Sequence, residues 1–346
     1  MPNDLGMKKV LVRFFLFLLL ALIGFAVIYH DLVAYGISQF RGQWKIVHEA
    51  RPLEEVLNDP MFPDSLKEKI RLIENIARYA QDSLGLKKSE NYTTLYDQHN
   101  KPLLWVLTAS EKYKLKSYEW SFPVVGTVSY KGFFDFEKGA LEDSLLKLKG
   151  LDTDYGEVSA WSTLGWFKDP ILSNMLRRTE GQLAELIIHE MTHATVYVKS
   201  NVDFNENLAS MIGEVGAERY LRSKYGSESA QLQDYIFRKE DYDRFSAHML
   251  SATQVLESLY NSFSNLTDSD MSARKALMIK AIVQNLDTVN FHYPYRYKEL
   301  FQRRMPNNAY FLNYVRYDSQ KNLMKYELEH IFNNNILRYL SSIKDR

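Results

Sequence analysis

A single long apolar run near the amino terminus differs from the mixed pattern of the rest of the chain. Every position from Val10 to Tyr29 is apolar except Arg13. About 20 apolar residues, each adding 1.5 Å of helix, span the hydrocarbon core of a bilayer, which is roughly 30 Å thick. The pattern therefore predicts a transmembrane helix over residues 10–30.

The charges on either side of this run predict its orientation. Lys8 and Lys9 precede it and Asp31 follows it. Basic residues stay on the cytoplasmic side, so residues 1–9 are expected to form a cytoplasmic tail and the rest of the chain to be exported. A cleaved signal peptide is the alternative, but its apolar region is usually about 7–15 residues long and ends in small residues. The length of this run and its lack of a clear cleavage sequence favour a retained anchor.

From residue 31 onward, helical and strand-like periods alternate. Within 31–100, apolar residues recur every three or four positions, which predicts helices. Segments 103–110 and 122–136 are rich in Val, Phe, Tyr and Thr and read as strands. A helix is expected at 137–149, followed by a further strand-like piece at 156–167.

After Asp169 the pattern is mostly helical, with no internal repeat and no low-complexity linker. Candidate helices occupy 180–199, 205–225, 229–263 and 272–287, and others follow towards the carboxy terminus. The sequence therefore predicts an α+β fold that is mostly helical, with a small sheet, preceded by one transmembrane helix.

The exported part divides into three expected segments. Residues 31–100 form a helical amino-terminal part, and residues 101–225 contain the sheet and the two helices that carry the candidate chemistry. Residues 226–346 form a helical carboxy-terminal part.

Composition excludes several classes of protein. The 346 residues include 43 Lys+Arg and 43 Asp+Glu, and this zero net charge argues against a nucleic-acid partner. The absence of cysteine excludes a disulfide framework, a cysteine-ligated zinc or iron–sulfur site and a cysteine nucleophile. The hydrophobic share of 46% excludes global disorder.

The strongest chemical signal is a pair of histidines at helical spacing. His189 and His193 are separated by four positions, with Glu190 directly after the first. Residues i and i+4 lie on one face of a helix, so both imidazoles can reach one zinc ion. Glu190 would then lie near the open position of the metal, where it can accept a proton from bound water.

A third ligand is expected from the next helix. Glu206 follows His193 after twelve intervening residues, and a turn near 199–203 would bring the second helix back antiparallel to the first. Two histidines and one glutamate leave a fourth position for water, which is the catalytic rather than the structural pattern. Glu214 and Glu218 compete for this role, but Glu206 is favoured.

Two neighbours of Glu206 are candidates for supporting the ligands. Glu214 lies eight residues further along and hence on a similar helix face, where it would accept the second ring proton of a ligating histidine. Asn205 directly precedes Glu206 and is the other candidate.

Several segments together resemble a bacterial family of predicted zinc aminopeptidases. They are 120–137, 161–178, 189–210 and 306–309, and the resemblance covers roughly residues 38–320. It implies a zincin-like metallopeptidase domain with a gluzincin-type site.

This resemblance implies roles for particular residues. His189, His193 and Glu206 would bind one Zn²⁺, and Glu190 would be the catalytic base. Tyr317 is a weak candidate for stabilising the oxyanion, because it follows the resembling segment 306–309; a merely packed ring is the favoured alternative. Many family members carry a lipid-attachment cysteine, which this chain lacks, so the helical anchor would replace it.

The expected function is hydrolysis of peptide bonds by a membrane-anchored zinc peptidase, with an aminopeptidase favoured. The expected location is a bacterial inner membrane, crossed once, with the catalytic domain in the periplasm. The expected partners are a peptide or protein substrate and the membrane, and the sequence does not predict an oligomeric state. A zinc endopeptidase and a membrane-tethered binding or chaperone module without activity are the alternatives. The G-x-M-E-N sequence of well-known zinc aminopeptidases is absent, so the residues themselves do not distinguish exopeptidase from endopeptidase.

Overall fold

The computed structural model describes residues 4–88, 91–122, 126–157, 168–199 and 201–344. Its contacts divide the chain into two compact units, Met1–His48 and Glu49–Arg346.

The first unit is helical. It consists of α1 (Asp4–Ile28) and most of α2 (His30–Glu49). Within α1, Lys8–Ile28 is long and apolar enough to cross a membrane, judged by length and composition alone. The large side chains of this stretch are exposed, as in Phe17 at 71%. Such exposure is typical of a signal sequence or of a helix whose partner is lipid.

The described residues of the second unit form eight short strands in three small sheets. The sheets have the orders β1-β2-β8, β6-β3-β7 and β4-β5, and every pairing is antiparallel except that of β2 with β8. The strands are β1 (Arg51–Pro52), β2 (Thr94–Tyr96), β3 (Trp105–Ser110), β4 (Trp120–Phe122), β5 (Gly126–Val128), β6 (Lys131–Phe133), β7 (Asp152–Glu157) and β8 (Ile171–Leu172).

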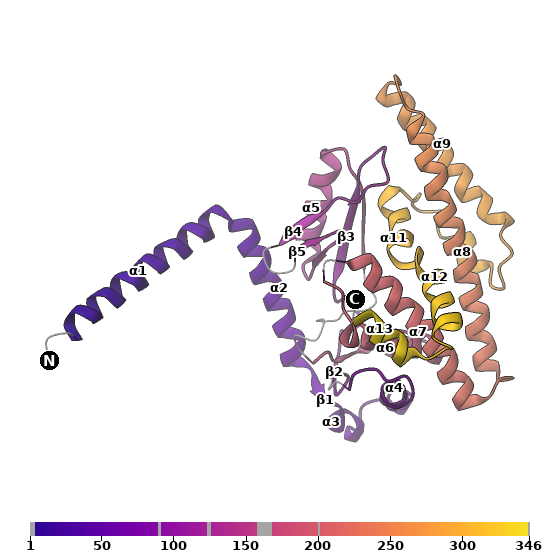
Figure 1. Ribbon diagram of the computed structural model, residues 1–346, viewed down its shortest axis with the longest axis horizontal. Helices are drawn as coiled ribbons and strands as arrows, with labels where there is room; N and C mark the ends of the chain where they lie inside the picture. The colour runs from indigo at the N-terminus through magenta and orange to yellow at the C-terminus, as the bar shows by residue number, and fades with distance from the viewer. Residues whose placement is uncertain (1–3, 89–90, 123–125, 158–167, 200, 345–346) are drawn as a thin grey trace. The chain divides into compact units, whose positions relative to one another are not determined.

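Helices make up most of the second unit, and Figure 1 shows α8 and α9 running side by side. The α-helices are α3 (Leu53–Asn58), α4 (Asp64–Asp82), α5 (Phe136–Leu148), α6 (Glu180–Thr195), α7 (Val202–Tyr225), α8 (Ala230–Asn261), α9 (Asp268–Gln284), α10 (Tyr295–Lys298), α11 (Asn308–Asp318), α12 (Lys321–Tyr326) and α13 (Ile336–Lys344). Short 3-10 turns occupy Ser173–Arg177 and Asn285–Thr288, and a π-helical turn occupies Glu327–Ile331.

The predicted fold class is confirmed in outline. The structure is a mostly helical α+β protein with small sheets and one apolar amino-terminal helix. The zincin-like classification and the subdivision at residues 100 and 225 stay predictions. Of the strand expected at 156–167, only 156–157 lie among the described residues, as the end of β7, and 158–167 lie outside them.

Local sequence signals explain the pair of helices at the centre of this unit. The Thr179 hydroxyl accepts a hydrogen bond from the backbone of Gln182, and the Gln182 side chain bonds back to Thr179, which is a capping box at the start of α6. The Asn201 side chain caps the start of α7. The prediction that the first helix extends to residue 199 is wrong, because α6 ends at Thr195 and Val196 is extended.

The two helices approach closely at one glycine. A Cβ on Gly213 of α7 would lie 2.9 Å from the backbone oxygen of Glu185 and 3.3 Å from the Cβ of His189, both on α6. Glycine therefore allows backbone-to-backbone packing beside the candidate site.

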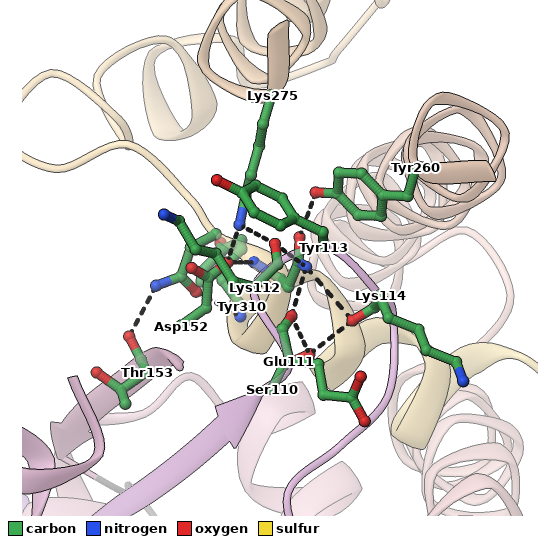
Figure 2. Close-up of polar contacts among 12 residues, drawn as sticks. Ser110, Glu111, Lys112, Tyr113, Lys114, Asp152, Thr153, Tyr260, Lys275 and Tyr310 are labelled. Atoms are coloured by element: carbon green, nitrogen blue, oxygen red, sulfur yellow. Dashed lines mark hydrogen bonds and ion pairs between the residues drawn. The ribbon is translucent and has the colours of Figure 1, made fainter. Parts of the chain in front are cut away.

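A polar network attaches α11 to the sheet β6-β3-β7 and to α8 (Figure 2). Asn308, which is completely buried, donates from its side-chain amide to the backbone oxygens of Glu111 and Lys112, at 2.9 and 3.2 Å. Its backbone N–H donates to Asp152 at 2.9 Å, and Tyr260 donates to its side-chain oxygen at 2.7 Å. The segment 306–309, which contributes to the family resemblance, thus fixes the start of the helix that ends near Tyr317.

The packing at Gly213 predicts the effect of adding one methyl group there. We expect Gly213→Ala to lower the free energy of unfolding by about 1–3 kcal/mol, because backbone atoms of α6 cannot move aside without displacing the helix. The measurement is a urea unfolding curve of the full chain in detergent, monitored by circular dichroism.

Gly216→Ala on the same helix is the matched control. Its new Cβ would lie 2.9 Å from Cδ1 and Cγ2 of Ile188 and from Cδ1 of Leu84, which are side-chain rather than backbone atoms, and alanine gains up to about 1 kcal/mol of helix propensity. Equal losses of stability in the two variants would contradict the role given to Gly213.

Candidate metal centre and its cavity

Three side chains converge between α6 and α7. The Nε2 atoms of His189 and His193 lie 3.1 Å apart, and each lies 3.5 Å from Oε2 of Glu206. One ligand atom from each residue falls within 4.8 Å of the other two, so the group could hold a metal ion. Two imidazole nitrogens and one carboxylate oxygen fit a divalent transition metal better than Ca²⁺ or Mg²⁺, which prefer oxygen ligands.

The three groups also perturb one another electrostatically. Burial opposes the charge on Glu206, but the two histidine rings hold the pKa of that carboxyl well below its usual value. Burial likewise opposes the charge on His189, yet the hydrogen bond with Glu206 and the charge of Glu190 raise the pKa of its ring. The cluster therefore combines negative charge with nitrogen donors, as a cation site requires.

Glu190 lies next to this cluster and is only 9% exposed. Burial raises the pKa of its carboxyl, and the neighbouring histidines oppose that shift. A buried carboxylate with a raised pKa is suited to accept a proton and later to release it.

A cavity of about 750 Å³ opens onto the cluster. Its walls come from β3, β7, α6, α7, α8 and α11, so the small sheet and the helices both contribute. Side chains that line it include Val106, Asp154, Glu185, His189, Glu190, His193, Glu206, Tyr235, Arg316 and Tyr317.

Tyr317 and Tyr130 both line this cavity. Burial raises the pKa of Tyr130 to about 12, with a further contribution from the charge of Glu206. Burial and the same carboxylate also raise the pKa of Tyr317. Both phenols are therefore protonated at neutral pH and can donate a hydrogen bond.

Tyr130 was not identified from the sequence. It lies in the resembling segment 120–137, but among 23 tyrosines nothing in its spacing marks it. Arg316 helps to place it: its guanidinium donates to Ser129 Oγ at 2.9 Å and lies 5.8 Å from the centre of the Tyr130 ring. A cation over the face of an aromatic ring is attracted to it.

The other acids considered as third ligand lie in different surroundings. The carboxylate of Glu214 pairs with Lys321 at 2.7 Å and with Lys239 at 3.3 Å. Glu218 pairs with Arg222 at 2.8 Å, on the surface side of α7. Glu206 is thus the acid whose carboxylate is grouped with the two histidines in the described part of the chain.

Asn205 has a clear structural partner. Its side-chain oxygen accepts a hydrogen bond from the backbone N–H of Val198, and its amide donates to the Val198 oxygen, both at 2.8 Å. This pair of bonds fixes the turn between α6 and α7, and so the position of the adjacent Glu206.

A family model described as "Putative aminopeptidase" matches residues 34–344. No curated protein and no solved structure matches the chain. Because the match covers most of the sequence, including every residue of the cluster, the chain belongs to this aminopeptidase family.

Proposed function

We propose that the protein is a membrane-anchored, zinc-dependent peptidase of the gluzincin type, and that it acts as an aminopeptidase. The observation that carries the proposal is the convergence of His189, His193 and Glu206 beside the buried Glu190, at the wall of a cavity. Membership of the family supports the cleavage of peptides in general.

Zinc is the proposed metal because the donor set matches its catalytic sites. Two histidines and one glutamate leave one coordination position open. A zinc ion bound there would polarise the scissile carbonyl and lower the pKa of a bound water towards ~7.

The protein's own residues would then move the protons. Glu190 accepts a proton from the attacking water and delivers it to the leaving amine. Because the residue is buried, its carboxylate is shielded from bulk water. The two hydrogen bonds between Asn205 and Val198 fix the turn that determines the position of Glu206. The three ligands would therefore stay aligned while the substrate enters.

A phenol is proposed to stabilise the oxyanion. Tyr317 is the candidate from the sequence, and Tyr130 lines the same cavity. Either group, protonated at neutral pH, could donate to the oxygen that becomes negative in the transition state.

The amino-terminal helix is proposed to anchor the enzyme in a bacterial inner membrane, with the second unit in the periplasm. The support is the length and apolar composition of Lys8–Ile28, with Lys8 and Lys9 at its amino-terminal end.

Two substitutions separate the role of the base from that of the ligands. We expect Glu190→Gln to bind zinc like the wild type but to lose roughly 10²–10⁴-fold in turnover, because no group accepts the water proton. His193→Ala should lose both zinc and turnover. Zinc content is measured by elemental mass spectrometry after dialysis, and products of a mixed peptide library are mapped by mass spectrometry, with the full chain in detergent.

His330→Ala is the control, since that ring is exposed and lies against Tyr326, with a hydrogen bond to its backbone oxygen and a stacking contact with its ring. Loss of single residues from free amino ends supports an aminopeptidase, whereas internal cuts indicate an endopeptidase with the same centre. If the wild type releases no more product than Glu190→Gln, that result would contradict a peptidase and favour a binding module.

A further prediction concerns the two phenols. We expect Tyr317→Phe to lower kcat by roughly 10²–10³-fold with little change in KM, because the lost hydrogen bond forms fully only in the transition state. Tyr130→Phe is the matched comparison, since it removes the same group from the same cavity. If Tyr130→Phe carries the loss and Tyr317→Phe does not, the role belongs to Tyr130.

A further inference from the structure

We propose that Glu185 binds the free α-ammonium group of the substrate and thereby selects the amino-terminal peptide bond. This inference rests on the proposed peptidase function and assigns a specificity residue to it. Glu185 lines the same cavity as the metal cluster.

The position of Glu185 matches the geometry of a peptide amino end. The α-nitrogen lies two covalent bonds, roughly 2.5 Å, from the first carbonyl carbon. A carboxylate that binds this nitrogen must therefore stand close to the group that binds the carbonyl. Glu185 lies four positions before His189 on α6, so the two side chains share a helix face with Cβ atoms about 6 Å apart.

The carboxylate of Glu185 is held in place from one side. The hydroxyl of Tyr235 donates to its Oε2 at 2.9 Å, and Tyr235 is itself buried. The ring of Tyr235 packs directly on Gly181, where an added Cβ would lie 2.5 Å from it. Oε1 of Glu185 accepts no hydrogen bond from any described residue, so a ligand in the cavity can use it.

The charge of Glu185 lacks the kind of cationic partner that other acids lining the cavity have. Glu214 pairs with two lysines, and Asp154 pairs with Arg304 at 3.3 Å. Among the described residues, no cation lies within ion-pair distance of Glu185, although Arg178 and Lys321 interact with its charge from further away. An incoming ammonium group would supply the missing positive charge.

The protonation of Glu185 agrees with this picture. Burial, followed by the nearby charge of Glu214, raises its pKa to about 7. The charged form of such a carboxylate is poorly stabilised by the protein alone. A bound cation therefore stabilises it more than it would a carboxylate that is already paired.

A rival role is support of the metal centre. From one turn away, Glu185 could instead act on the ring of His189, as was expected of Glu214. The two roles differ in what they affect: ammonium recognition alters the preference for free amino ends, whereas support of His189 alters zinc affinity.

The experiment measures binding without turnover. The zinc-loaded Glu190→Gln chain in detergent is titrated calorimetrically with trialanine amide and with its N-acetylated form. We expect the free amine to bind at least about 10-fold more tightly, and this preference to disappear when Glu185→Gln is added, because a neutral amide replaces a charged partner. Zinc affinity, measured by competition with a chelator, should match that of the parent.

Two further variants test the structural basis. Tyr235→Phe should reduce the preference partly, because the carboxylate loses the hydrogen bond from the Tyr235 hydroxyl. Glu180→Gln, on the same helix but paired outside the cavity with Lys224, should leave the preference unchanged. Tyr235→Phe also keeps the test available if Glu185→Gln fails to fold.

The outcomes are distinct. A preference for the free amine that survives Glu185→Gln overturns the proposal, and so does a loss of zinc affinity in that variant. If the wild type cleaves no peptide, the proposed function fails, whereas the binding preference still decides the role of Glu185.

Discussion

The contact between α6 and α7 is the constraint on which the rest of the site depends. Gly213 lets the two backbones meet beside His189, and the bonds between Asn205 and Val198 fix the turn that connects the helices. Together they bring Glu206 to 3.5 Å from both imidazole Nε2 atoms. A looser packing would separate the carboxylate from the histidines, and a metal centre tolerates errors of only a few tenths of an ångström.

Behind this contact, buried charges tie the carboxy-terminal helices to α7. Lys321 lies within 3.0 Å of carboxylates from Glu214 of α7, Asp243 of α8 and Asp318 of α11. Burial opposes the charge on Lys321, but these three acids raise its pKa above the usual value. Such a group is costly to break in part, because a single lost partner leaves an uncompensated buried charge. The network therefore couples the position of α11, and of Tyr317, to the helix that carries Glu206.

The sequence predicted the parts of the site that depend on local spacing. His189, Glu190 and His193 share one helix, and a short turn brings Glu206 back, so helical period and one turn place them together. Tyr130 and Glu185 could not be found in this way. Tyr130 depends on where Arg316 of a distant helix lies, and the role of Glu185 depends on Tyr235, which reaches it only because position 181 is a glycine. The end of α6 was misplaced for a similar reason, because the turn after it is fixed by the hydrogen bonds between Asn205 and Val198.

One helix face can account for both chemistry and selectivity. Glu185, His189 and His193 follow one another at four-residue intervals, so each step along α6 advances about 6 Å. The capping box at Thr179 and the packing at Gly213 fix this helix at both its start and its middle. If Glu185 holds the ammonium group, the distance from the amino end to the cleaved bond is set by helix geometry rather than by a flexible loop. With the amino end fixed in this way, the first peptide bond lies at the metal and the second lies beyond it. A rigid helix would therefore permit removal of one residue at a time.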